Sequence, residues 1–296
     1  TGVADVAAKL AAAGQQLALD APFPEASVGG TVAVNVSGPR RMWYGSVRDL
    51  LIGVTVVRPD GVIAHSGGKV VKNVAGYDLG KLMTGSYGTL GLITECAFRL
   101  HPVPAARAYV MRRAAPDVVG TLVAAVRESQ VAPSAVEIDL SPGGEVEIVV
   151  LVEGTQTGVE QRAAAVASLI GGEVTAVPDW FGAYPWQPGE IGVKLTAPLS
   201  RVPAVLASTR GHGIPVRGSA GAGVLYANLS RATDPAKALA ELRDVSEHAV
   251  VLTAPAPVRD QLDIWGSVPG LQLMRRIKEQ FDPDARFAPG RFVGGI

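Results

Sequence analysis

The sequence predicts an α+β fold in two parts, a glycine-rich first part and a ferredoxin-like second part. Glycines and short apolar runs crowd the chain up to Pro104, whereas strand and helix patterns alternate regularly beyond it. Between the two parts, His101-Pro102-Val103-Pro104 carries two prolines, which interrupt regular secondary structure. We therefore place a domain boundary near residue 104, with domains at 1–104 and 105–255 and a tail at 256–296 that returns to the first domain.

The composition is that of a globular protein without a net charge. The chain has 296 residues, of which 48% are hydrophobic and 18% are charged, so there is enough apolar material for a buried core. Lysine plus arginine balance aspartate plus glutamate at 27 each, so no overall field favours nucleic acid or anionic lipid. No apolar run has the length of a membrane span. These features predict a cytoplasmic protein that binds no nucleic acid, inserts into no membrane, and associates with a membrane only through partners.

The first part is expected to consist mainly of loops and short strands. A helix is predicted over residues 5–13, ending at Gly14, and an apolar strand over 48–57. The turn Pro59-Asp60-Gly61 then returns the chain as a hairpin through 62–64. The single cysteine, Cys96, alternates with polar neighbours and is predicted to be a structural thiol on a strand. Little further helix is expected in this part.

The second part follows a β-α-β-β-α-β order, which is typical of the ferredoxin-like arrangement. The predicted elements are a strand at 109–113, a helix at 117–129, strands at 135–140 and 145–153, a helix at 157–170 and a strand at 173–177. A further set is expected to continue the sheet, with a strand at 190–196, a helix at 202–210, strands at 214–218 and 223–229, a helix at 235–247 and a strand at 248–253. A last helix is predicted over 269–280. The aromatic segment 179–186 is interpreted either as core filling or as a lid over a cleft.

The densest chemical signal is the segment 24–38, which combines three glycines with small polar residues. Glycines let backbone N–H groups approach a pyrophosphate closely, and Ser27, Asn35 and Ser37 add hydroxyl and amide partners. The alternative interpretation is a structural Gly-Gly turn between strands. The spacing is neither that of a Rossmann Gly-x-Gly-x-x-Gly nor that of a P-loop, so neither nucleotide site is predicted.

Three more glycine-anchored segments follow, at 44–49, 72–79 and 85–95. In order and spacing, the four segments resemble the second half of the PCMH-type FAD-binding domain of the vanillyl-alcohol-oxidase-like flavoproteins. The resemblance covers residues 15–104. That family includes D-lactate dehydrogenases and glycolate oxidase subunits, so the resemblance implies FAD as cofactor and a ferredoxin-like cap domain beyond residue 104.

The resemblance also implies which positions contact the cofactor. The family's Pro-x-x-Thr-Ile-Gly-Gly loop, which holds the pyrophosphate, matches Pro24 and Ser27-Val28-Gly29-Gly30. Its Ser-Gly and Tyr-Gly elements match Ser37-Gly38 and Tyr44-Gly45, and its adenosine-contacting Gly-Thr-Leu-Gly-x-Ile segment matches residues 88–93. Pro289-Gly290-Arg291 resembles the family's closing Asn-Pro-Gly-Lys near the flavin ring, with Ala288 in place of asparagine. The expected cofactor-binding set is Pro24, Ser27, Val28, Gly29, Gly30, Asn35, Ser37, Gly38, Tyr44, Gly45, Gly76, Gly88, Thr89, Leu90, Gly91, Ile93 and Arg291.

Two departures from the family pattern shape the predicted function. The Gly-x-Gly-Thr subdomain that opens the family's FAD domain is missing on the amino-terminal side of this sequence. Hydroxy-acid dehydrogenases of the family carry His-x-Gly-Asp-Gly-Asn-x-His, whose histidines bind a metal, where this chain has Ser219 to Tyr226. No metal site and no catalytic residue are therefore predicted. His212 and His248 are expected to be turn or surface residues.

Retained FAD motifs without metal ligands resemble the accessory FAD-binding subunit of a multi-subunit glycolate oxidase. The resemblance implies an FAD-dependent oxidoreductase subunit that acts in glycolate oxidation. Its implied partners are a catalytic FAD subunit and an iron–sulfur subunit, since one cysteine cannot ligate a cluster. Two alternatives remain open: a self-sufficient FAD-dependent dehydrogenase with a non-metal base, and a non-redox scaffold subunit.

Overall fold

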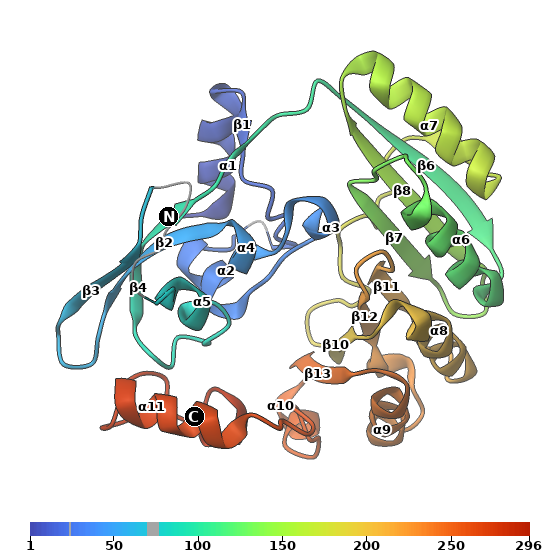
Figure 1. Ribbon diagram of the computed structural model, residues 1–296. Coiled ribbons are helices and arrows are strands. Elements are labelled where there is room, and N and C mark those ends of the chain that lie inside the picture. The colour runs from blue at the N-terminus through green and yellow to red at the C-terminus, as the bar shows by residue number, and fades with distance from the viewer. Residues whose placement is uncertain (24, 70–76) are drawn as a thin grey trace. The chain divides into compact units, whose positions relative to one another are not determined.

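A small antiparallel sheet forms the centre of the first unit. The computed structural model describes residues 1–23, 25–69 and 77–296 (Figure 1). The sheet has the order β3-β2-β4, with β2 at Leu51–Val57, β3 at Ile63–Gly67 and β4 at Leu92–Phe98. The predicted hairpin is confirmed, because β2 pairs antiparallel with β3 across a turn in which Gly61 has a φ of +81°. A second ribbon pairs β1 (Gln15–Gln16) with β5 (His101–Pro102).

This unit contains more helix than the sequence led us to expect. The predicted first helix is confirmed as α1 (Val3–Ala12). The alternative of a Gly-Gly turn between strands and the expected start of a strand at residue 48 were wrong. Gly29 and Gly30 lie in α2 (Val28–Val34), and α4 (Val47–Leu50) precedes β2. Two more short helices, α3 (Arg41–Tyr44) and α5 (Leu79–Met83), were not predicted.

The unexpected helices form because capping and burial outweigh weak helix propensity. The Ser27 hydroxyl accepts the N–H of Gly30 at the start of α2, and Ser46 and Asp49 form a capping box at α4. Val32 is fully buried in a core cluster with Leu19, Val47, Leu50 and Leu51. Cys96 packs against the same cluster, in agreement with a structural thiol, and burial raises the pKa of its thiol to about 11.

The second unit is one eight-stranded antiparallel sheet made of two ferredoxin-like halves. Strand order is β13-β10-β12-β11-β7-β8-β6-β9, and each half follows the β-α-β-β-α-β sequence predicted for it. Antiparallel pairing of β11 with β7 joins the halves. The first half comprises β6 (Ala106–Ala114), α6 (Pro116–Glu128), β7 (Ala135–Leu140), β8 (Val146–Gly154), α7 (Gln156–Ile170) and β9 (Glu173–Thr175). The second half comprises β10 (Gly192–Thr196), α8 (Val202–Gly211), β11 (Val216–Ser219), β12 (Val224–Asn228), α9 (Pro235–Val245) and β13 (His248–Thr253).

The helices of this unit cover one face of its sheet. Helices α6, α7, α8 and α9 pack beside one another, and α6 and α7 lie against β6 and β8 (Figure 1). The strand residues turned toward them, such as Ile138, Ile148 and Val150, are fully buried. Alternate residues of the same strands form the opposite, helix-free face.

The chain closes with α10 (Ala256–Arg259) and the predicted last helix, observed as α11 (Leu271–Phe281). Residues 1–103 and 267–296 form the first unit and residues 104–266 the second, so residues 256–266 of the expected tail fall in the second unit.

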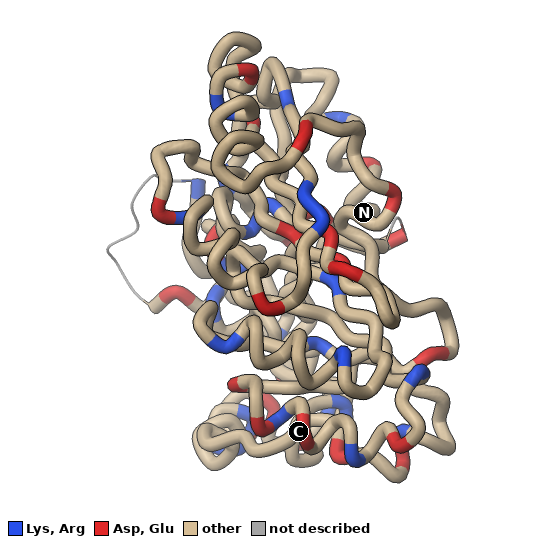
Figure 2. Tube along the Cα trace, turned by 90° about the vertical axis from the view of Figure 1, so that its right-hand side faces the viewer, with Lys and Arg blue, Asp and Glu red and all other residues tan. Residues whose placement is uncertain are grey.

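No helix among the described residues is both long and apolar enough to cross a membrane. Lysines and arginines are interspersed with aspartates and glutamates along the trace (Figure 2).

Candidate cofactor site

The amino-terminal turn of α2 presents backbone donors at the surface of the first unit. Ser27 and Gly30 are exposed, and the Gly30 N–H donates to Ser27 Oγ at 3.1 Å. The Val28 N–H donates to Thr1 O at 3.0 Å. Within the described part of the chain, the Gly29 N–H has no acceptor. A free N–H at a helix amino terminus is suited to an anionic group.

Gly29 occupies a position where the protein itself does not require glycine. A Cβ added there would meet only the Ile93 carbonyl oxygen, at 3.8 Å, an ordinary contact. Glycine inside a helix costs about 1 kcal/mol relative to alanine. The Cβ would otherwise extend into open space beside the first turn of α2. The residue present therefore fits a pyrophosphate that approaches the backbone closely.

The start of β4 lies beside this turn, because a Cβ on Gly29 would approach the Ile93 carbonyl oxygen, and the loop at residues 86–91 leads into that strand. Thr89 and Leu90 are buried: the Thr89 hydroxyl donates to Ser86 O at 2.7 Å, and Leu90 belongs to a core cluster. These side chains therefore point into the protein, and this loop would offer a cofactor its backbone. Gly91 is also buried, and a Cβ added to it would lie 3.3 Å from the Val57 carbonyl oxygen. Close packing therefore explains the glycine at this position.

The carboxy-terminal segment brings Arg291 to the same loop. A Cβ on Gly88 would lie 3.9 Å from Arg291 Nη1, and the rings of Tyr87 and Phe292 stack with centroids 5.1 Å apart. Arg291 is exposed and available to a phosphate or a flavin carbonyl. Ala288, which stands where the family has asparagine, has a φ of +42°, a conformation that favours asparagine or glycine.

Most of the remaining predicted residues have structural roles in the first unit. Ser37 is buried, and its hydroxyl accepts the Val47 N–H at 2.9 Å. A Cβ on Gly38 would lie 2.3 Å from Asp20 O, so the fold itself requires glycine there. Gly45 has a φ of +86° at the end of α3. The buried Asn35 Oδ1 accepts no hydrogen bond from the described residues, which leaves it available to a donor on a ligand.

Tyr44 belongs to a polar cluster at some distance along the chain from α2. Its ring contacts the His101 ring edge-on, with centroids 4.7 Å apart, and lies under the Arg40 guanidinium. Arg40 forms a bidentate pair with Asp20. Sequence reasoning missed Arg40 and Asp20, although Gly38-Pro39-Arg40 directly follows the predicted Ser37.

The structure thus brings together Gly29 with Ile93, and Gly88 with Arg291. It assigns folding roles to Ser37 and Gly38. Pro24 and Gly76, which were also predicted to contact the cofactor, lie outside the described residues.

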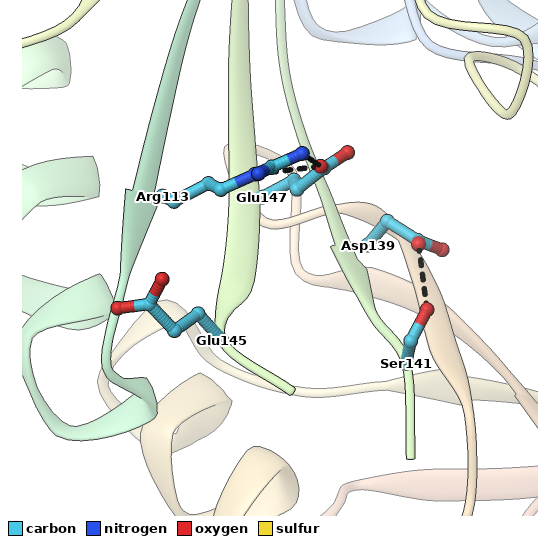
Figure 3. A pocket seen from close by; sticks show the side chains of 5 residues that line it. All are labelled: Arg113, Asp139, Ser141, Glu145 and Glu147. Atoms are coloured by element: carbon cyan, nitrogen blue, oxygen red, sulfur yellow. Dashed lines mark hydrogen bonds and ion pairs between the residues drawn. The ribbon is translucent and has the colours of Figure 1, made fainter. Parts of the chain in front are cut away.

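A polar pocket of about 330 Å³ opens on the helix-free face of the second unit (Figure 3). Register places Arg113, Glu147, Asp139 and Arg217 in one row across β6, β8, β7 and β11. Arg113 pairs with Glu147 at 2.7 Å, and Arg217 pairs with Asp139 at 2.6 Å. Burial opposes ionisation of Glu147, but hydrogen bonds from Trp180 and Arg113 outweigh it and lower the pKa of its carboxyl. Ser141 and Glu145 complete the lining.

Aromatic side chains cover the continuation of this row. Tyr226 follows Arg217 in register, and the Tyr184 ring packs against it with centroids 4.6 Å apart. Trp186 stacks on Tyr184 at 4.4 Å, and the Tyr184 carbonyl accepts a bond from Arg217. The segment 179–186 therefore packs on the sheet, which favours core filling. Among the described residues, no group of three or more His, Cys, Asp or Glu side chains is arranged to hold a metal ion.

Sequence comparison supports the same cofactor. Residues 1–67 match the family FAD_binding_4, described as FAD binding domain. The chain is 46% identical over 108 residues to glycolate oxidase subunit GlcE of Escherichia coli (strain K12), covering 36% of this chain and 31% of that protein. It is 47% identical over 78 residues to glycolate oxidase subunit GlcD of Bacillus subtilis (strain 168), covering 26% and 17%. The mitochondrial D-lactate dehydrogenase [cytochrome] of Arabidopsis thaliana is 45% identical over 83 residues, covering 28% and 15%. The matches thus span less than a third of each relative.

Solved structures share the fold over nearly the whole chain. A glucooligosaccharide oxidase of Acremonium strictum superposes with a TM-score of 0.65 at 15% identity, covering 97% of this chain and 74% of that one. The VAO-type flavoprotein MtVAO615 of Myceliophthora thermophila C1 gives 0.65 at 14% identity, covering 97% and 64%. The fold is that of the vanillyl-alcohol-oxidase-type FAD-linked oxidoreductases. Its first unit carries part of an FAD binding domain, so the predicted fold class and cofactor are confirmed.

Proposed function

We propose that this chain belongs to the FAD-binding accessory subunit of a glycolate-oxidising complex. In that complex it works with a catalytic FAD subunit and an iron–sulfur subunit, and glycolate is oxidised to glyoxylate. The observation that carries the proposal is the identity to GlcE and GlcD, supported by the match of residues 1–67 to an FAD binding domain. We place the subunit in the cytoplasm, with any membrane association made through its partners.

The proposed cofactor contacts are the first turn of α2, the loop at residues 88–93 and Arg291. The Gly29 N–H and the α2 amino terminus would face the pyrophosphate, and Arg291 would neutralise negative charge. Bound FAD supplies a two-electron acceptor. The role of the protein residues at this site is to bind and orient that group.

Oxidation of the hydroxy acid itself is assigned to the partner. The pocket of the second unit is lined by Arg113, Asp139, Glu145 and Glu147, and the guanidinium groups of Arg113 and Arg217 are paired with Glu147 and Asp139. Because both guanidinium groups are paired and Glu145 adds a negative charge, this lining is poorly suited to a 2-hydroxy-acid carboxylate. Next to it, Tyr226 stands where catalytic relatives carry a metal-binding histidine and packs against Tyr184.

Co-expression tests the partner role. The full-length protein, expressed with the larger flavoprotein and the iron–sulfur subunit, is expected to co-purify with both. The complex is expected to reduce a dye in the presence of glycolate, and omission of this subunit should abolish that reaction. Equal dye reduction by the other two subunits, without co-purification of this one, would contradict the proposal and favour an independent oxidoreductase.

A further inference from the structure

Lys278 ties together three segments of the first unit from a buried position. Its ammonium donates to the Thr89 carbonyl at 2.8 Å, to the Phe287 carbonyl at 3.0 Å and to Asp282 Oδ2 at 2.6 Å. An ammonium has three N–H donors, so every one of them is used. These bonds connect α11 to the loop before β4 and to the carboxy-terminal segment.

Asp282 completes the network on the other side. Its side chain is fully buried and accepts the N–H groups of Arg286 and Phe287, at 2.9 Å and 2.7 Å, besides the Lys278 ammonium. A buried ion pair with all its donors and acceptors used holds one geometry, because any shift leaves an unpaired charge in the interior.

The network supports a backbone conformation at residues 87 and 88 that is uncommon for a bulky residue. Tyr87 has a φ of +56° and Gly88 a φ of +74°, two consecutive residues in the left-handed region. A bulky residue such as tyrosine is uncommon there and needs support from its surroundings. Support comes from Lys278 on the Thr89 carbonyl and from Phe292 stacked on the Tyr87 ring.

We propose that Lys278 is a positioning residue for the cofactor. Through Asp282 and the Thr89 carbonyl, it sets the approach of Arg291 to Gly88 and the shape of the loop at residues 88–93. The inference rests on the proposed function, since that loop and Arg291 are the proposed FAD contacts. Lys278 touches no reacting atom; it acts through the segments that it fixes.

The test uses the full chain with the double substitution Lys278→Met and Asp282→Asn. Either single change leaves a charge unpaired in the interior, whereas the double change removes both charges. The two backbone N–H groups reach different oxygens of Asp282, so the single carbonyl oxygen of asparagine keeps one of these two bonds. Lys237→Met is the matched control, because Lys237 lies on α9 with a side chain that is 69% exposed. FAD affinity is measured by flavin fluorescence titration, and amide hydrogen exchange is measured without FAD.

In the double variant, we expect exchange at residues 86–91 to accelerate about tenfold while the amides of β2 and β4 keep their protection. FAD affinity is expected to fall by about tenfold, because the site loses its preorganisation. Lys237→Met should change neither. Unchanged exchange at 86–91, or unchanged FAD affinity, would overturn the positioning role and leave the proposed function intact. Absence of FAD binding by the wild-type chain would overturn both.

Discussion

Gly29 and Gly38 lie in the same glycine-rich segment, yet the structure gives them different roles. Gly38 meets the backbone of Asp20, whereas Gly29 faces open space apart from the distant Ile93 carbonyl. The sequence motifs predicted both as cofactor residues. The spacing of glycines along the chain does not show which atoms lie where a Cβ would be. The sequence could also not reveal Lys278, whose partner Thr89 lies 189 positions away.

Replacing Gly38 by alanine is expected to destabilise the first unit. The new Cβ would lie 2.3 Å from the Asp20 carbonyl oxygen, a rigid backbone atom, so the loop must shift. Overpacking of this kind costs about 1–3 kcal/mol of unfolding free energy. Urea denaturation of the variant and the wild type measures the difference. Equal denaturation midpoints and slopes for the variant and the wild type would show that the loop accommodates a Cβ at position 38 without strain.

Acid stability provides a second test at the scale of single residues. Burial acts to raise the pKa of Asp282, but hydrogen bonds from Lys278, Phe287 and Arg286 outweigh it and lower the pKa below its ordinary value of 3.8. A depressed carboxyl pKa stabilises the fold above 3.8, and the contribution is lost as the pH falls from there through the folded pKa. The variant with Lys278→Met and Asp282→Asn should therefore lose less stability than the wild type over that interval in thermal unfolding. A parallel decline of the two proteins would contradict the assignment.

At the scale of elements, the sequence predicted the second unit well and the first unit poorly. Long strands such as β8 and amphipathic helices such as α6 have clear hydrophobic periods, and their positions agree with prediction to within a few residues. Helix α2 has two glycines and three valines in seven residues, a composition that disfavours helix. Tertiary burial of Val32 and the Ser27 cap decide its conformation, and neither is visible in local periodicity.

The Ser27 cap leads to a prediction for α2. In Ser27→Ala, the Gly30 N–H loses its acceptor, and the unfolding free energy is expected to fall by about 1 kcal/mol. Ser27→Asp should retain the cap and most of the stability. Thermal unfolding followed by circular dichroism compares the variants. A Ser27→Ala protein as stable as the wild type would mean that the hydroxyl does not hold the helix start.

At the scale of the whole molecule, the two units differ in how the chain builds them. The second unit is one continuous stretch, residues 104–266, whereas the first unit combines residues 1–103 with 267–296. The sequence indicated two ferredoxin-like sets of elements but not the antiparallel seam between β7 and β11 that makes them one sheet. The Arg217–Asp139 pair lies across this seam and joins residues 78 positions apart. Contacts between such distant residues produce no local pattern in the sequence from which the pairing could be predicted.

Residues 104–266 are expected to fold as an isolated fragment. They contain a complete eight-stranded sheet, the helices that cover one face of it, and their own buried core. The purified fragment should unfold cooperatively in urea and give dispersed amide resonances. A fragment without a cooperative transition would show that the sheet depends on the first unit.

FAD binding by the first unit at the amino terminus of α2 is tested by titrating the wild-type chain and Gly29→Ala with FAD. Alanine fits the helix and should keep the unfolding free energy or raise it by up to about 1 kcal/mol. Its methyl group would occupy the space assigned to the pyrophosphate, so FAD affinity should fall by about tenfold or more while Gly38→Ala serves as the destabilised comparison. A stable Gly29→Ala protein that binds FAD as tightly as the wild type would contradict the account.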